Sequence, residues 1–123
     1  MGSINYLKMN GHQGKILACE RGIRTFSNGE YDRFTLDVSF IADLKKDINF
    51  PHKIIVDPSH AAGRSDIVEN LTYAGISAGA DGAIIEVKIN KGNKPLCDAS
   101  QAVTIDNLRK IIKNCRKIKN MAD

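Results

Sequence analysis

The chain has 123 residues, enough for one domain with a core of its own. Hydrophobic residues make up 42% and charged residues 26%, an ordinary balance for a globular protein, and no apolar run reaches the length of a transmembrane helix or follows the plan of a signal peptide. The three cysteines have no CxxC spacing and fit reduced thiols better than disulfides. We therefore expect one cytoplasmic domain, residues 1–123, with no membrane partner.

The net charge of +4 raises the question of a nucleic-acid partner. Much of the positive charge falls in one region, at Lys94, Arg109, Lys110, Lys113, Arg116, Lys117 and Lys119. Five of these residues belong to one predicted helix and Lys119 directly follows it, and basic residues near a helix C-terminus are favoured by the helix dipole. No aromatic RNA-binding motif and no zinc-finger spacing accompanies them. We therefore expect a solvent-exposed helix face and no nucleic-acid partner.

The first predicted elements are the tail of a helix over residues 4–9 and a short apolar strand over residues 15–20. Cys19 in this strand is expected to be a small core residue. Arg21 and Gly22 follow at the end of the strand, where Gly22 allows a close backbone approach. The guanidinium of Arg21 suits a bidentate contact with phosphate or carboxylate, and residue types alone leave a surface loop equally open.

The central strand is Ile54-Ile55-Val56, whose three β-branched residues predict a strand that is buried on both faces. It follows a short helix predicted over residues 40–47 with Ser39 as its N-cap. The strand runs directly into Asp57, Pro58, Ser59 and His60, and Pro58 stops the hydrogen-bond ladder. Its polar residues therefore stand at the carboxyl end of the strand, where parallel α/β folds bind ligands.

A helix over residues 66–78, capped by Ser65, and a strand over residues 83–87 come next. Strand, helix and strand within about thirty residues form a βαβ unit, so the sheet is predicted to be parallel. A loop rich in Gly and Asn then leads to Asp98, and Thr104 caps a final helix over residues 105–118. Its predicted buried stripe is Ile105, Leu108, Ile111, Ile112, Cys115 and Ile118.

One imidazole and two carboxylates fall at the strand-end face, from His60, Glu86 and Asp98. Such nitrogen and oxygen ligands suit Mn²⁺, Zn²⁺, Fe²⁺ or Co²⁺ better than Ca²⁺. Glu86 interrupts an apolar strand, where an unpaired carboxylate is costly, so it is expected to have a cation beside it. The alternative for His60 is a hydrogen-bonded structural histidine, and spacing alone leaves both interpretations open.

Several segments resemble the C-terminal part of 3-deoxy-7-phosphoheptulonate (DAHP) synthases, in the order and near the spacing of that family. They are Cys19-Glu20-Arg21-Gly22-Ile23-Arg24-Thr25-Phe26, Thr35-Leu36-Asp37, Ile55-Val56-Asp57-Pro58-Ser59-His60-Ala61, Ala78-Gly79-Ala80-Asp81-Gly82, Glu86-Val87 and Asp98-Ala99-Ser100-Gln101-Ala102. The resemblance spans about residues 4–118. It implies an α/β fold, the C-terminal portion of a (β/α)8 TIM barrel with about three βα units.

The resemblance also implies a reaction, the metal-dependent condensation of phosphoenolpyruvate with erythrose 4-phosphate that opens the shikimate pathway. By position, His60, Glu86 and Asp98 match three of the four metal ligands of the family. The divalent metal would act as a Lewis acid. Arg21 matches the arginine that holds the phosphate of phosphoenolpyruvate. Three further residues fall near the site without an assigned role, namely Arg24, Asp57 and Arg64.

The sequence also departs from the family. None of Cys19, Cys97 and Cys115 matches the cysteine that is the fourth metal ligand, and only three of the eight barrel strands are found. Three strands have two open edges, so we expect self-association or binding to a complementary N-terminal barrel half. The chain is thus part of an enzyme, a non-catalytic fragment or interaction subunit, or a self-contained phosphate-binding module.

Overall fold

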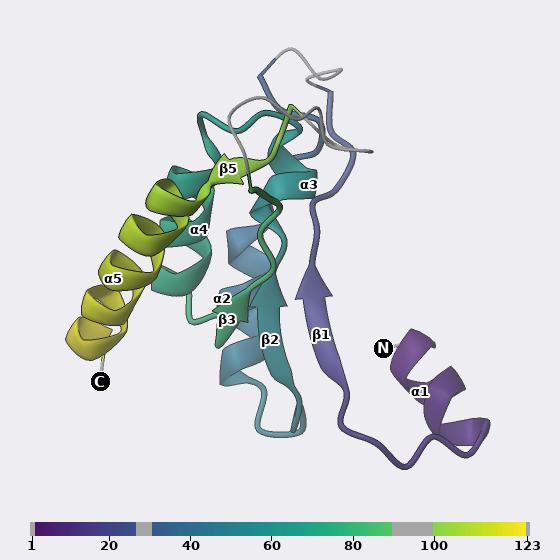
Figure 1. Cartoon of the computed structure of the whole chain (residues 1–123). Coiled ribbons are helices and arrows are strands. Elements are labelled where there is room, and N and C mark those ends of the chain that lie inside the picture. The colour runs from purple at the N-terminus through teal and green to yellow at the C-terminus, as the bar shows by residue number, and fades with distance from the viewer. Residues whose placement is uncertain (1, 27–30, 90–99, 123) are drawn as a thin grey trace.

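The fold is a three-stranded parallel sheet with helices packed on one face (Figure 1). The structure is a computed structural model, and it describes residues 2–26, 31–89 and 100–122. The strands are β1 (Leu17–Glu20), β2 (Lys53–Val56) and β3 (Gly82–Ala83), in the order β1-β2-β3. In the register, Cys19 is paired with Ile55 and Val56 with Ala83. The parallel α/β arrangement predicted from the sequence is confirmed.

Three helices, α2 (Val38–Lys46), α4 (Val68–Ser77) and α5 (Ile105–Ala122), form the layer that contributes to the core. The β-branched residues of β2 that face this layer are fully buried, as are apolar residues from α2 and α4. The main cluster consists of Ile41, Ile54, Val56, Ile76 and Ala80, with Leu44, Phe50, Ala78, Cys115 and Ile118 packed against it. Burial of these side chains supplies the main stabilisation of the sheet–helix contact.

The predicted strand over residues 83–87 is divided between two sheets. After Ile84 donates its N–H to the carbonyl of Val56 at 2.8 Å, the chain leaves β2. Its continuation, β4 (Val87–Lys88), pairs in parallel with β5 (Val103–Thr104). The single-strand prediction is therefore wrong, because the segment takes its later partners from the chain that leads into α5.

The sheet face opposite the helices is largely uncovered. On this face Leu17 is 54% exposed, and Ile84 just after β3 is 48% exposed. Cys19 is exposed and its partner Ile55 is only partly buried. The predictions of a core Cys19 and of a central strand buried on both faces are therefore wrong, because none of the described helices packs against this side.

Two helix starts differ from the prediction. The N-cap of α2 is Asp37, whose carboxylate accepts the N–H of Phe40 at 3.0 Å, and Ser39 lies within the helix. The N-cap residue of α4 is Ile67, whose apolar side chain cannot cap the helix, and the predicted cap Ser65 lies two residues earlier, where its backbone N–H donates to the carbonyl of Ser100 at 2.8 Å.

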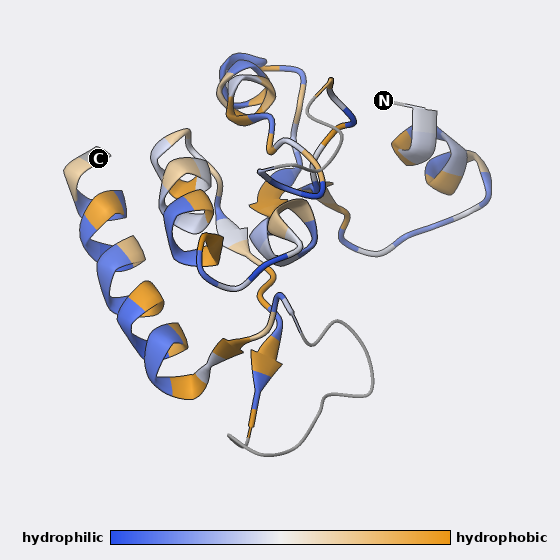
Figure 2. Ribbon diagram, turned by 90° about the horizontal axis from the view of Figure 1, so that it is seen from above, coloured by the Kyte–Doolittle hydropathy of each residue, from blue (hydrophilic) through white to orange (hydrophobic). Residues whose placement is uncertain are grey.

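The ends of the chain carry two further helical surfaces. Helix α1 (Gly2–Met9) has no buried residue and lies apart from the sheet in both overall views (Figures 1 and 2). The polar side of α5 is visible as a blue band (Figure 2), and the predicted basic face is confirmed for Arg109, Lys110, Lys113, Arg116, Lys117 and Lys119, all exposed. Lys94 lies outside the described residues. Within the described chain, no helix has the length and apolar character needed to cross a membrane.

The apolar stripe of α5 is only partly buried. Ile111 is 1% exposed, whereas Ile105 and Ile112 keep 38% and 43% of their surface exposed. Ile112 lines an open groove of about 410 Å³ between α4, α5 and β3. The predicted buried stripe is therefore wrong at Ile105 and Ile112.

Candidate active site

The site begins where β2 ends and helix α3 (Pro58–Ala62) starts. Asp57 is the N-cap of this helix, and its Oδ1 accepts the N–H of His60 at 3.0 Å. Pro58 occupies the first helical turn, where its fixed φ suits the helix and its missing N–H costs nothing. Asp followed by Pro is thus a helix-start signal, and it sets His60 in the first turn, directly beyond the carboxyl end of the strand.

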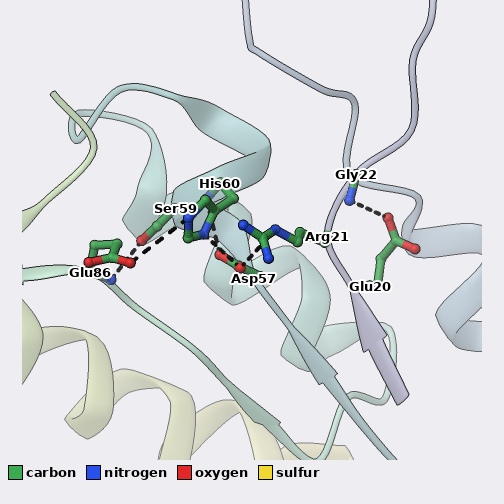
Figure 3. Close-up of polar contacts among 7 residues, drawn as sticks. All are labelled: Glu20, Arg21, Gly22, Asp57, Ser59, His60 and Glu86. Carbon is green, nitrogen blue, oxygen red and sulfur yellow. Dashed lines mark hydrogen bonds and ion pairs between the residues drawn. The ribbon is translucent and has the colours of Figure 1, made fainter. Parts of the chain in front are cut away.

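The ring of His60 is held by the same carboxylate. His60 Nδ1 lies 2.7 Å from Asp57 Oδ2, and the two side chains are 16% and 3% exposed. Because a carboxylate accepts, we assign the ring proton to Nδ1. Nε2 then presents its lone pair toward Glu86, whose Oε1 lies 3.9 Å away (Figure 3). A histidine fixed in this way by a carboxylate is the usual arrangement of a metal-ligating imidazole.

Glu86 is placed through its backbone. Its N–H donates to the hydroxyl oxygen of Ser59 at 2.9 Å, and Ser59 is fully buried. On the other side, Val103 donates its N–H to the carbonyl of Glu86 at 2.9 Å. The carboxylate itself is 39% exposed. The prediction of a carboxylate buried within an apolar strand is therefore wrong, because the chain has already left the sheet at this residue.

Arg21 reaches the site from the end of β1. Its Nε lies 3.5 Å from Asp57 Oδ2, while 61% of its side chain is exposed. The following Gly22 has φ +95°, and a Cβ there would come within 2.6 Å of Phe34 Cβ. The carboxylate of Glu20 accepts the N–H of Gly22 at 2.8 Å. The close approach predicted for Gly22 is confirmed, and it fixes the backbone beside Arg21.

Among the predicted site residues, the structure brings Arg21, His60 and Glu86 to one place around Asp57 (Figure 3). Asp98 lies outside the described residues. In the part of the chain that the structure describes, no group of three or more His, Cys, Asp and Glu side chains is placed to hold a metal ion.

Arg64 and Arg24, the two further arginines singled out from the sequence, are both exposed. Arg64 bonds to Asp66, with 2.7 Å from Nε to Oδ1. This contact lowers the pKa of the Asp66 carboxyl.

Sequence reasoning missed three roles. Ser59 holds the amide of Glu86, a residue 27 positions later, and no local signal reveals such a contact. Glu20 accepts N–H groups from Gly22 and, at 3.2 Å, from Asp37. The capping role of Asp57 could have been found, because Asp before Pro is a typical helix start.

Two of the described residues offer ligand atoms of the kinds that a divalent transition-metal ion accepts. His60 and Glu86 offer one nitrogen and one carboxylate, and their 3.9 Å separation is too long for a hydrogen bond. The Nδ1 contact with Asp57 turns the Nε2 side of the ring toward Glu86. Desolvation of the sulfur and then the negative charge of Asp57 raise the pKa of the Cys19 thiol.

Strand-end side chains on a parallel sheet place this chain in the class of α/β proteins that bind ligands at the carboxyl ends of their strands. The sequence profile of the DAHP synthetase I family matches residues 2–123. The chain belongs to this family.

Two curated relatives agree with the assignment. The phospho-2-dehydro-3-deoxyheptonate aldolase of Thermotoga maritima is 38% identical over 116 residues, which cover 94% of this chain and 32% of the relative. The 2-dehydro-3-deoxyphosphooctonate aldolase of Geobacter sulfurreducens is 28% identical over 115 residues, covering 85% of this chain and 39% of the relative. The chain thus spans about a third of the length of these relatives.

Solved structures show the same relation. A truncated form of 3-deoxy-D-arabino-heptulosonate 7-phosphate synthase from T. maritima is similar with a TM-score of 0.84 and 36% identity, over 98% of this chain and 44% of that one. A crystal structure of phospho-2-dehydro-3-deoxyheptonate aldolase (DAHP synthase) from the same organism has the same TM-score and identity, with 34% of its chain covered. The described fold is therefore shared with part of a larger protein.

Proposed function

We propose that the chain supplies part of a metal-dependent DAHP synthase, which condenses phosphoenolpyruvate with erythrose 4-phosphate in the first step of the shikimate pathway. The observation that carries this proposal is the meeting of Arg21, His60 and Glu86 around Asp57 at the strand ends (Figure 3). Membership of the DAHP synthetase I family supports the same reaction.

Each side chain has a task in this proposal. The exposed guanidinium of Arg21 binds the phosphate of phosphoenolpyruvate, and its contact with Asp57 orients the fork. His60 and Glu86, together with Asp98, hold the divalent cation, which is Mn²⁺, Zn²⁺, Fe²⁺ or Co²⁺. When bound, the cation supplies a Lewis acid for the aldehyde of erythrose 4-phosphate.

We further propose that the fold is the C-terminal portion, about three βα units, of a (β/α)8 barrel. Barrel strands have one face toward the helices and one toward the interior, and closure leaves no edge. Here the apolar face that carries Leu17 and Ile84 is half exposed, and β1 and β3 each pair only with β2 among the described strands. Further strands would cover this face and pair with both edges.

The proposed partner is a complementary N-terminal barrel half or, failing that, a second copy of the chain. This chain covers 44% and 34% of the two solved relatives, so both relatives extend well beyond the matched part. The groove between α4, α5 and β3 offers an apolar surface for such a partner. Its apolar lining includes Ile76, Ala83, Ile85, Leu108, Ile111 and Ile112.

The alternative is a non-catalytic barrel fragment or interaction subunit. It is favoured by the uncovered apolar face, since an isolated chain would expose this surface to water. Both candidates are proposed to act in the cytoplasm, where the unpaired cysteines remain reduced.

Incubation with phosphoenolpyruvate, erythrose 4-phosphate and Mn²⁺, followed by an assay of released phosphate, tests the enzyme proposal. The chain is assayed alone and with the non-matching N-terminal part of the Thermotoga relative. Release that disappears in His60→Ala and persists in the matched control His52→Ala supports the proposal. No release under either condition favours the non-catalytic subunit, and equal release by both variants would exclude His60 from the chemistry.

A further inference from the structure

Two side chains of the proposed site, His60 and Arg21, share one carboxylate oxygen of Asp57. Asp57 Oδ2 lies 2.7 Å from His60 Nδ1 and 3.5 Å from Arg21 Nε (Figure 3). The other oxygen, Oδ1, accepts the backbone N–H of His60 at 3.0 Å. The carboxylate is 3% exposed, whereas the arginine is 61% exposed. The buried acceptor is therefore fixed, and the arginine is the partner with room to move.

We propose that Asp57 is a positioning residue that couples an anion held by Arg21 to a cation held by His60. This inference depends on the proposed function, which assigns phosphate to Arg21 and the metal to His60. It adds that the two ligands influence each other's affinity through one carboxylate oxygen.

The coupling follows from competition for Oδ2. Without a bound anion, the positive guanidinium of Arg21 lies close to Asp57 Oδ2. It therefore reduces the negative charge that this oxygen offers to the Nδ1–H of His60. A bound phosphate gives the guanidinium a better bidentate partner, so its contact with Asp57 weakens. The Nδ1–H contact then strengthens, and Nε2 becomes a better electron donor toward a metal. Binding linkage is reciprocal, so the cation also favours the anion.

Asp57→Asn separates this role from simple folding. Its single amide oxygen can keep the cap on the N–H of His60, but its NH₂ group then faces Nδ1. An NH₂ donor requires the lone pair on Nδ1, which moves the ring proton to Nε2. The variant therefore retains the helix start while it removes the metal-binding lone pair and the shared anionic oxygen.

Mn²⁺ titration, with and without inorganic phosphate, measures the coupling. In the wild-type chain we expect phosphate to tighten Mn²⁺ binding by about fivefold, the lower end of typical allosteric coupling. Arg21→Gln is the reference for the phosphate effect, because it lacks the proposed phosphate-binding guanidinium. Any complex between Mn²⁺ and free phosphate forms equally in every sample and cancels in this comparison. Asp57→Asn should weaken Mn²⁺ binding by about tenfold or more. A phosphate effect of equal size in wild type and Arg21→Gln would overturn the proposal.

The ¹⁵N spectrum of the His60 ring in the metal-free chain gives a second readout. Wild type should show the Nδ1–H tautomer and Asp57→Asn the Nε2–H tautomer, a change that loss of stability alone does not produce. Asp81→Asn, a matching substitution of a partly buried carboxylate at the other end of the strands, should leave the His60 signals unchanged. If Asp57→Asn does not fold, phosphate must still shift the His60 ring signal in wild type and not in Arg21→Gln. Absence of that difference overturns the proposal.

The coupling and the proposed function fail in different ways. Mn²⁺ binding that survives His60→Ala unchanged would refute the metal site itself. Binding that requires His60 but gives the same affinity with and without phosphate would refute only the coupling through Asp57.

Discussion

Asp81 joins the start of β3 to the start of β2, at the opposite end of the strands from the site. Its carboxylate accepts the N–H of Ile54 at 2.9 Å and receives Lys45 at 3.2 Å and Lys53 at 3.2 Å. Both lysines are substantially exposed, at 37% and 71%. Asp81→Asn keeps an acceptor for Ile54 and loses two surface ion pairs, so it should lower the free energy of unfolding by about 0.5–1 kcal/mol.

Asp81→Ala also removes the acceptor for the Ile54 N–H. An unsatisfied buried amide costs about 1–3 kcal/mol in addition. The total loss for Ala should therefore be about 1.5–4 kcal/mol, larger than that for Asn. Urea unfolding followed by circular dichroism measures both variants. Equal losses for Asn and Ala would refute the view that the Asp81 carboxylate stabilises β2 through its backbone.

The pH dependence gives an independent check on Asp81. Burial raises the pKa of its carboxyl, but the Ile54 hydrogen bond and the two lysines outweigh burial and hold the pKa below the usual 3.8. A depressed carboxyl pKa in the folded state stabilises the protein above the unfolded pKa and loses this effect as the pH falls through the folded pKa. The difference between wild type and Asp81→Asn should therefore be the same at about pH 7 and about pH 5, and it should shrink as the pH falls below about 4. A difference that stays constant would contradict this explanation.

Three further predictions concern packing, phosphate and assembly. Gly75→Ala places a Cβ 2.6 Å from Val56 Cγ1, so urea unfolding should show a loss of about 1–2 kcal/mol despite the better helix propensity of Ala, and a gain in stability would be contrary to this packing. Calorimetric titration with phosphoenolpyruvate should show binding lost in Arg21→Ala and partly restored in Arg21→Lys, which lacks the fork; equal affinity in Arg21→Ala and wild type would exclude the assigned role. Sedimentation at micromolar concentration should show self-association that a complementary N-terminal half suppresses, whereas a stable monomer with a sharp cooperative melt would argue against the partial barrel.

The elements that the sequence predicts best are those whose burial depends on neighbours close in the chain. Ile54 and Val56 are buried as the β-branched pattern indicates, and a helix is present within the predicted range 66–78, as α4. Cys19 and Ile55 were misjudged, because an apolar residue in a strand indicates a covered face without showing what covers it. The helix layer covers one face of the sheet, and the other is left largely open.

The sequence predicts which residues belong to the candidate site, but it does not predict the contacts that hold them in place. The order of the motifs identifies Arg21, His60 and Glu86, which the structure brings together. The contact that places Glu86 runs through the buried hydroxyl of Ser59, and pairs this distant in sequence leave no periodic signal. The missed cap at Asp57 is different, since an Asp before a proline is a local signal from which a capped helix could have been predicted.

Mn²⁺ binding to the chain tests the proposed metal site most directly. Three samples are titrated under the same conditions and followed by the electron paramagnetic resonance of free Mn²⁺: the wild type, His60→Ala and His52→Ala. His52 lies near the other end of β2, where its ring contacts Phe50 at 5.4 Å between centroids, so its substitution is a matched control. The proposal predicts that His60→Ala abolishes binding and that His52→Ala retains the wild-type affinity. Indistinguishable titrations of all three would contradict a metal site at His60.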